Sequence, residues 1–303
     1  MKDRVAAIDC GTNSIRLLVA DVSDGVAEEL VRDMRIVRLG QDVDATGRLA
    51  PEAIERTLAA TREYAETIAA LHADRVRFCA TSAARDASNA EEFAAAVEAI
   101  VGVRIEILTG IEEAKASFVG ATRGLASDGD ALVVDIGGGS TELVVGRDEV
   151  VAWSTSLDVG SVRMTERFLS TDPPTAGEID ACSSYLRDAL TAEALGLAPV
   201  ATLVGVAGTI TTVAAHAMNL PAYDRSAIHG AQLSIDQTRA ACAALAGMTV
   251  DERRALPFMH PGRADVIGGG ALVLDAVLTS LPLATDALIV SGHDILDGIA
   301  LAG

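Results

Sequence analysis

Two segments of the chain repeat one pattern of apolar and polar positions. Residues 5–20 read VAAIDCGTNSIRLLVA and residues 131–146 read ALVVDIGGGSTELVVG, which aligns Asp9 with Asp135. An apolar run, an Asp, a turn of small residues and a second apolar run predict two strands joined by a tight turn. Such a turn directs N–H groups and hydroxyls at one spot and can bind an anion, although a plain hairpin with Gly for turn chemistry gives the same pattern. Two copies with the Asp in register favour a phosphate site.

The rest of the first half alternates between helical and strand patterns. Apolar residues at helical spacing behind Pro51 predict a helix over residues 51–73. Other helices are expected over residues 89–101 and 112–124, strands over 26–32, 76–80 and 104–108, and a loop over 81–85. Small and acidic residues at 126–130 predict a linker, which sets the domains at residues 1–126 and 127–303.

The second half restarts with the repeated hairpin and again alternates. Strands are expected over residues 150–157, 200–206 and 288–291, and helices over 162–169, 175–195, 209–218, 266–280 and 294–301. Each half is therefore an α/β layer that opens on a hairpin. This order predicts a duplicated α/β architecture of two domains with an interdomain cleft.

Charge and composition restrict the partners. The net charge is −19 and aromatic residues make up 3% of the chain, which argues against nucleic-acid polymers as partners because these need a basic, base-stacking surface. Exposed charges farther away than about 8 Å are largely screened at physiological salt, so a local cluster with a metal ion can still bind phosphate.

The cysteines and the apolar segments favour a cytoplasmic protein. Cys10, Cys79, Cys182 and Cys242 form no C-x-x-C pair and stand in apolar surroundings, which is typical of reduced core residues. The first residues lack a signal-peptide pattern. The uncharged run over residues 198–223 is long enough to span a bilayer, but its Gly, Thr and His residues divide it into a strand, a turn and a helix.

Six segments, in order, resemble one family. They read AIDCGTNSIRLLV, ATSAARDASN, ILTGIEEA, VVDIGGGSTELVV, GVAGTITTVAA and VSGHDILDGIA. They are similar to the exopolyphosphatase/guanosine pentaphosphate phosphohydrolase (Ppx/GppA) family of the actin-like ATPase superfamily. The resemblance covers nearly the whole chain and implies a duplicated actin-like (ribonuclease H-like) fold in its short, two-domain form, and a homodimer.

The resemblance also assigns the catalytic base. Glu112 and Glu113 begin the helix expected after Thr109-Gly110, and Glu113 matches the family's base, which directs water onto a terminal phosphate. From spacing alone, the two acids could instead only stabilise the start of a helix.

Carboxylates and small residues supply the other expected site groups. Asp9, Asp135 and Glu142 are candidate ligands for Mg²⁺ or another divalent cation, although Glu142 could instead face solvent from its strand. Arg85 could fork onto a phosphate or face solvent, and Gly208 and Thr209 form a third turn before a helix. The expected phosphate-binding residues are Thr12, Asn13, Ser14, Arg85, Gly137, Gly138, Gly139, Ser140, Gly208 and Thr209.

The predicted activity is a metal-dependent phosphohydrolase that releases the terminal phosphate of a phosphate chain. The resemblance implies inorganic polyphosphate as the substrate, with short chains favoured because this chain lacks the family's helical domain, or guanosine pentaphosphate. Two alternatives stay open: an ATP-dependent phosphotransferase acting on a small molecule, and a non-catalytic actin-like nucleotide-binding protein.

Overall fold

A computed structural model describes residues 3–23, 25–125, 129–148 and 150–302. The chain forms two compact units: unit 1 contains Met1–Gly120 and Asp294–Gly303, and unit 2 contains Ala121–His293. The boundary expected at residues 126/127 stays a prediction, since residues 126–128 of the expected linker lie outside the described residues. The C-terminal segment, assigned to the second half from the sequence, packs within unit 1.

Unit 1 is built on a five-stranded mixed sheet. Its strands, in sheet order, are β3 (Val26–Ile36), β2 (Ser14–Ser23), β1 (Asp3–Cys10), β4 (Arg75–Ala80) and β5 (Glu106–Ile107). The first three strands pair antiparallel, whereas β4 and β5 run parallel to β1. Its helices are α1 (Val43–Thr46), α2 (Pro51–Ala70), α3 (Ser82–Asp86), α4 (Ala90–Val101), α5 (Gly110–Thr122) and α13 (Ile295–Leu301).

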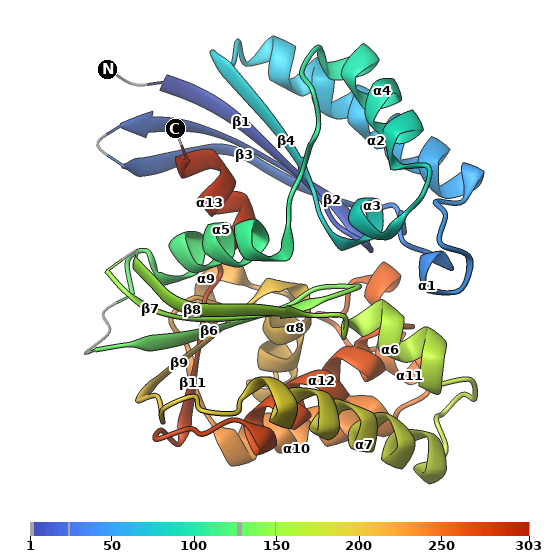
Figure 1. Cartoon of the computed structure of the whole chain (residues 1–303), viewed down its shortest axis with the longest axis vertical. Coiled ribbons are helices and arrows are strands. Elements are labelled where there is room, and N and C mark those ends of the chain that lie inside the picture. The colour runs from blue at the N-terminus through green and yellow to red at the C-terminus, as the bar shows by residue number, and fades with distance from the viewer. Residues whose placement is uncertain (1–2, 24, 126–128, 149, 303) are drawn as a thin grey trace. The chain divides into compact units, whose positions relative to one another are not determined.

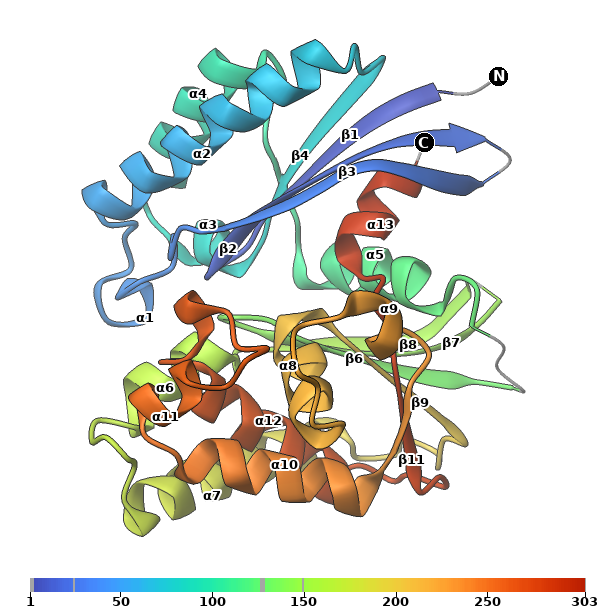
Figure 2. The ribbon, with the colours of Figure 1, turned by 180° about the vertical axis from the view of Figure 1, so that it is seen from behind.

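The two faces of this sheet are covered by different helices (Figures 1 and 2). In β1, Ala6, Ile8 and Cys10 join the apolar cluster beneath α2 and α4. Ala7 belongs to a second cluster with Ile299 and other residues of α13. The period of two in a strand therefore places Asp9 on the α13 side, because Asp9 shares the face of Ala7.

Unit 2 repeats this sheet with one strand added. Its strands, in sheet order, are β10 (Gln232–Ser234), β11 (Ala287–Val290), β9 (Thr202–Val206), β6 (Ala131–Ile136), β7 (Thr141–Arg147) and β8 (Val150–Leu157). Strands β8, β7, β6, β9 and β11 correspond, in sheet order and direction, to β3, β2, β1, β4 and β5 of unit 1. The pairings of β2 with β3 and of β7 with β8 also shift register at aligned positions, Val19/Ala20 and Val145/Gly146. The expected duplicated, mixed α/β fold is confirmed.

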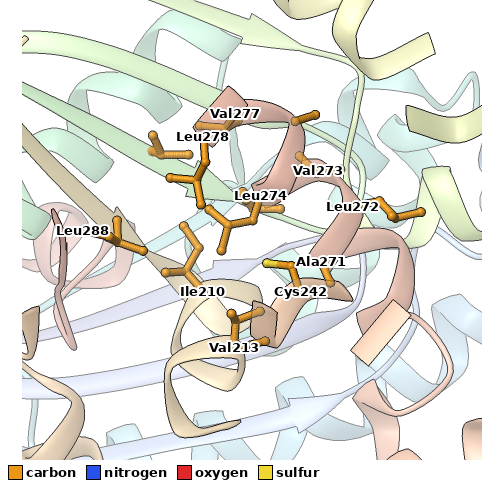
Figure 3. Packing of buried hydrophobic residues seen from close by; sticks show 14 of the residues in the cluster. Ile210, Val213, Cys242, Ala271, Leu272, Val273, Leu274, Val277, Leu278 and Leu288 are labelled. Carbon is orange, nitrogen blue, oxygen red and sulfur yellow. The ribbon is translucent and has the colours of Figure 1, made fainter. Parts of the chain in front are cut away.

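The core of unit 2 surrounds α12. Its helices are α6 (Ser161–Phe168), α7 (Ala176–Glu193), α8 (Ala207–Ala217), α9 (Arg225–Ile228), α10 (Ile235–Gly247), α11 (Val250–Arg254), the 3₁₀ turn η1 (Pro261–Arg263) and α12 (Ile267–Ser280). Helix α12 packs against α10, α6 and α7, and its Leu274 lies among Ile210 and Cys242 (Figure 3). Close helix packing explains Gly269, where a Cβ would overlap α6 at Ser161.

Two local expectations were wrong and others were confirmed. Residues 81–85, expected as a loop, contain most of α3, and the strand expected over residues 104–108 shortens to β5. All four cysteines are free and buried, as expected. Within the described ranges, no helix is both long enough and apolar enough to cross a membrane.

The docking of α13 in unit 1 depends on Gly298. A Cβ at this position would overlap the carbonyl group of Ala116 in α5. We expect Gly298→Ala to lower the free energy of unfolding by about 1–3 kcal/mol through overpacking. In Gly177→Ala, the new methyl group of α7 meets open space, so stability should rise by about 0.4–1 kcal/mol. Denaturant titration measures both, and a Gly298→Ala variant as stable as the wild type would show that α13 is loosely docked.

Candidate active site

The two repeated hairpins end in turns closed by the same hydrogen bond. The Gly11 amide donates to the Ser14 carbonyl at 2.9 Å, and the Gly137 amide donates to the Ser140 carbonyl at 3.0 Å. These donors and acceptors occupy aligned positions of the sequence repeat. The tight turns expected from the pattern are therefore present in both units.

The start of α6 holds the second turn by its carbonyl groups. The amides of Ser161 and Val162 donate to the carbonyls of Gly137 and Gly138 at 2.9 and 2.8 Å. In a planar trans peptide the C=O and the following N–H point in opposite directions, so the amides of Gly138 and Gly139 point away from α6. Backbone N–H groups turned to one side in this way form an anion-binding nest.

The first turn is held in the same manner by the segment that follows β3. The Gly40 amide donates to the Thr12 carbonyl at 2.9 Å, and the Val37 amide to the Asn13 carbonyl at 3.0 Å. The Thr12 hydroxyl shares a buried 2.9 Å hydrogen bond with the Ser82 hydroxyl of α3. The side chain of Thr12 is thus fixed within unit 1, and its expected contact with phosphate stays a prediction.

A chain of three charged side chains, two buried carboxylates and a partly buried guanidinium, begins at the end of β1. Arg16 lies opposite Asp9 in the β1–β2 register and donates from Nε and Nη2 to Asp9 Oδ2 at 2.9 and 2.5 Å. Its Nη1 donates to Oδ2 of Asp294, the residue that caps α13. Two carboxylates therefore share one guanidinium.

The second oxygen of Asp9 has no such compensation. Asp9 is 4% exposed, and its Oδ1 is buried without a hydrogen-bond partner. Burial raises the pKa of Asp9 above the usual range of a carboxyl, although the charge and hydrogen bonds of Arg16 oppose this shift. The folded chain consequently binds a proton at Asp9 more readily than the unfolded chain does, and a cation at Oδ1 would relieve the same cost.

In unit 2 the aligned positions carry two acids. Asp135 lies opposite Glu142 in the β6–β7 register, and both are buried. They lie on the sheet face opposite the core residues Leu132 and Val134, because side chains alternate along β6. Glu142 is 1% exposed, so the alternative in which it faces solvent is wrong; its Oε1 accepts the Ser156 hydroxyl at 2.7 Å.

The structure brings together two residues expected to act in the reaction. Arg85, the penultimate residue of α3, donates from Nη1 to Glu113 Oε2 at 3.0 Å and to the Leu108 carbonyl at 3.0 Å. Glu113 is 7% exposed. The alternative of a solvent-facing Arg85 is therefore wrong, since its guanidinium binds Glu113 and holds that carboxylate in one orientation.

Glu112 caps the start of α5 with its side chain. Its Oε2 accepts the Thr109 amide and the Thr109 hydroxyl, both at 2.8 Å, and its own amide donates to Thr109 Oγ1. This reciprocal pattern is a capping box. These hydrogen bonds also lower the pKa of Glu112. The helix-start explanation thus accounts for Glu112 and leaves Glu113 for another role.

The third turn lies at the start of α8. Ala207 has a φ of 67°, a left-handed conformation that is rare for a residue with a Cβ and is often found at functional sites. A Cβ on Gly208 would overlap the guanidinium of Arg263, which donates to the Gly208 carbonyl at 3.4 Å. The Thr209 side chain packs against Gly270 of α12, so phosphate binding at this turn stays a prediction.

Sequence reasoning missed three charged residues at these turns. Arg163 donates from Nε to the Gly139 carbonyl at 2.8 Å, Arg263 covers the third turn, and Asp294 binds Arg16. The Asp294 and Arg263 contacts join positions far apart in the sequence. Of the three, Arg163 alone had a local sequence signal for a site near the second turn, because it is a basic residue in the first turn of the helix expected over residues 162–169.

The described side chains include no cluster of three or more His, Cys, Asp or Glu residues able to hold a metal ion. Asp9 belongs to unit 1, whereas Asp135 and Glu142 belong to unit 2, so a metal site shared by all three stays a prediction. The donor chemistry nevertheless fits Mg²⁺, which prefers carboxylate oxygens. The buried, unpartnered Oδ1 of Asp9 fits a divalent cation in particular.

The packing of the second turn gives a testable prediction. A Cβ at Gly160 would lie 2.5 Å from the Gly138 carbonyl carbon, so Gly160→Ala should displace the turn. We expect catalytic efficiency for phosphate release from short polyphosphate to fall roughly 100-fold, since a shift of about 1 Å can cost this much. Gly247→Ala is the matched control, because its methyl group meets open space in the same unit. Equal activity of the two variants would show that the turn does not position a phosphate.

Comparisons with known proteins identify the family. The model of the Ppx/GppA phosphatase family matches residues 18–302. Exopolyphosphatase 2 of Mycobacterium tuberculosis is 51% identical over 314 residues, which cover 99% of this chain and 98% of that protein.

Solved structures agree over the same length. The crystal structure of an exopolyphosphatase-like protein superposes with a TM-score of 0.93 at 45% identity, covering 99% of this chain and 97% of the other. The Aquifex aeolicus member of the Ppx/GppA family gives a TM-score of 0.85 at 35% identity, covering 100% and 97%. The family predicted from the six sequence segments is confirmed: the chain belongs to the Ppx/GppA phosphatase family.

Proposed function

We propose that this chain is an exopolyphosphatase-type phosphoanhydride hydrolase that needs a divalent cation. It removes the terminal phosphate from inorganic polyphosphate, with short chains preferred, or from guanosine pentaphosphate. The substrate class is supported by the relative from Mycobacterium tuberculosis, which is named an exopolyphosphatase. A homodimer and a cytoplasmic location remain predictions from the sequence.

The observation that carries hydrolysis is the separation of roles between Glu112 and Glu113. The first is occupied in the capping box, whereas the second is buried and held by Arg85. Hydrolysis of a phosphoanhydride needs a group that orients water and accepts its proton. Glu113 is the proposed base, and Arg85 would hold its carboxylate in one orientation.

The turns are the proposed phosphate-binding elements. Amides of Gly138 and Gly139, with Asn13 in the first turn, would donate to phosphoryl oxygens, whose negative charge is stabilised by fixed dipoles without reorganisation. Mg²⁺ would be held by Asp9, Asp135 and Glu142 and would neutralise the charge of the phosphate oxygens. Such neutralisation offsets the acidic character of the chain, whose net charge is −19.

A substrate panel tests this function. Phosphate release should be measured on short polyphosphate, long polyphosphate, guanosine pentaphosphate and ATP, each with Mg²⁺ and with a chelator. We expect release from short polyphosphate or guanosine pentaphosphate, lost on chelation. Consumption of ATP only when an acceptor is present would instead identify a phosphotransferase, and no release from any phosphate chain would leave a non-catalytic binding protein.

Paired substitutions test the base. Glu113→Gln keeps the shape of the side chain but cannot accept the proton, so turnover should fall by roughly 10²–10⁴-fold while the fold is retained. Glu112→Gln should weaken the cap and lower the melting temperature, with turnover at saturating substrate close to that of the wild type. Turnover of Glu113→Gln within threefold of the wild type would remove Glu113 from this role.

A further inference from the structure

We propose that Asp294 is a positioning residue that enables Asp9 to hold a divalent cation, by taking up part of the charge of Arg16. This inference deepens the proposed function and rests on it, because it concerns the metal ion of that reaction. It adds to the site a residue from the far end of the chain, 278 positions from Arg16.

The three residues meet on one face of the unit 1 sheet. Asp9 and Arg16 face each other across β1 and β2 on the α13 side, and α13 contacts both strands. Side-chain exposure is 5% for Asp9, 17% for Arg16 and 11% for Asp294. Water therefore screens these charges little, and their interactions are strong.

The net charge of Asp9, Arg16 and Asp294 together decides whether this group attracts a cation. One guanidinium and one carboxylate would form a neutral pair with little attraction for a cation. With Asp294 as the second carboxylate on Arg16, the group carries a net charge of about −1, counted from ordinary ionisation states. The Asp9 Oδ1 atom, which is buried and has no hydrogen-bond partner, is the oxygen of this group that a cation would bind.

Asp294 is itself held in a fixed orientation. Its Oδ1 accepts the Leu296 amide at 3.0 Å, and its own amide donates to Asp297 Oδ2 at 3.0 Å, which completes the capping box of α13. Asp297 is in turn bound by Arg32 of β3 at 2.5 Å. The other carboxylate oxygen of Asp294 thus binds Arg16 in a defined direction and keeps the guanidinium shared.

Asp297→Asn is a matched control for Asp294→Asn. Both substitutions remove one charge from the same capping box, but Asp294 binds Arg16, whereas Asp297 binds Arg32. Asparagine is also a good N-cap residue, so Asp294→Asn should keep α13 in place. If Asp294 only docks the helix, the two variants should behave alike.

The experiment titrates Mg²⁺ into the full chain at pH 8 with inorganic phosphate present. It follows the rise in melting temperature, which reports binding without turnover, and the Mg²⁺ dependence of phosphate release. We expect Asp294→Asn to raise the half-saturating Mg²⁺ concentration 10–100-fold, the usual effect of losing a residue that orients a metal ligand. Asp297→Asn should stay within threefold of the wild type.

A second variant, with the opposite expected effect on Mg²⁺ binding, tests the inference if Asp294→Asn does not fold. Arg16→Gln leaves Asp9 and Asp294 without the guanidinium, so Mg²⁺ should raise its melting temperature more than that of the wild type. Three results would each overturn the inference. The first is a smaller rise in melting temperature for Arg16→Gln than for the wild type, and the second is a half-saturating Mg²⁺ concentration for Asp294→Asn within threefold of the wild type. The third is no effect of Mg²⁺ on a wild-type enzyme that releases phosphate. Failure of the proposed function differs, since the wild type would then release no phosphate.

Discussion

One arginine shared between two buried carboxylates is the interaction on which the first unit depends. Arg16 joins Asp9 at the end of β1 to Asp294 at the start of α13. Burying two carboxylates and part of a guanidinium costs free energy that their mutual attraction only partly offsets. The raised pKa of Asp9 reflects this cost. A chain under selection for stability alone would gain from apolar residues here, so the charges indicate a site that needs them.

Duplication supplies the frame, and divergence at one pair of positions supplies different chemistry. Both hairpins share the closing hydrogen bond, and the strand that follows each, β3 or β8, pairs with the same shift in register. Where the first hairpin has Arg16 opposite Asp9, the second has Glu142 opposite Asp135. In the first unit the aspartate therefore lies opposite the positively charged side chain of Arg16, whereas in the second unit two carboxylates lie opposite each other. One fold thus serves two electrostatic environments.

Most of the fold could be predicted from the sequence because its signals are local. Apolar runs joined by turns of small residues predicted both hairpins, and Pro51 with helical spacing predicted α2. The short helix α3 was missed, since Ser82 and its neighbours resemble a loop and tertiary contacts, including the Thr12 hydroxyl, fix it. The place of α13 was also missed, because no local pattern shows that a terminal helix packs on the first sheet.

In the candidate site too, local signals could be predicted from the sequence and long-range contacts could not. The roles of Glu112 and Glu113 could not be separated by spacing, since both lie in the first turn of α5; the capping box and the contact with Arg85 distinguish them. Arg263 and Asp294 reach their turns through long-range packing, which one sequence does not encode in any short segment. Buried carboxylates at Asp9, Asp135 and Glu142 were expected, because acids in apolar strands need a partner.

The most direct measurement is the anomalous diffraction of Mn²⁺ in crystals grown with a short polyphosphate and the Glu113→Gln variant. We expect a peak within direct ligand distance of Asp9 Oδ1, about 2.1 Å for an oxygen ligand of a Mg²⁺-like ion. Arg16 should still be bound to Asp294 in the same crystals. A peak remote from Asp9, or an Asp9 whose two oxygens are both bound by Arg16, would contradict it.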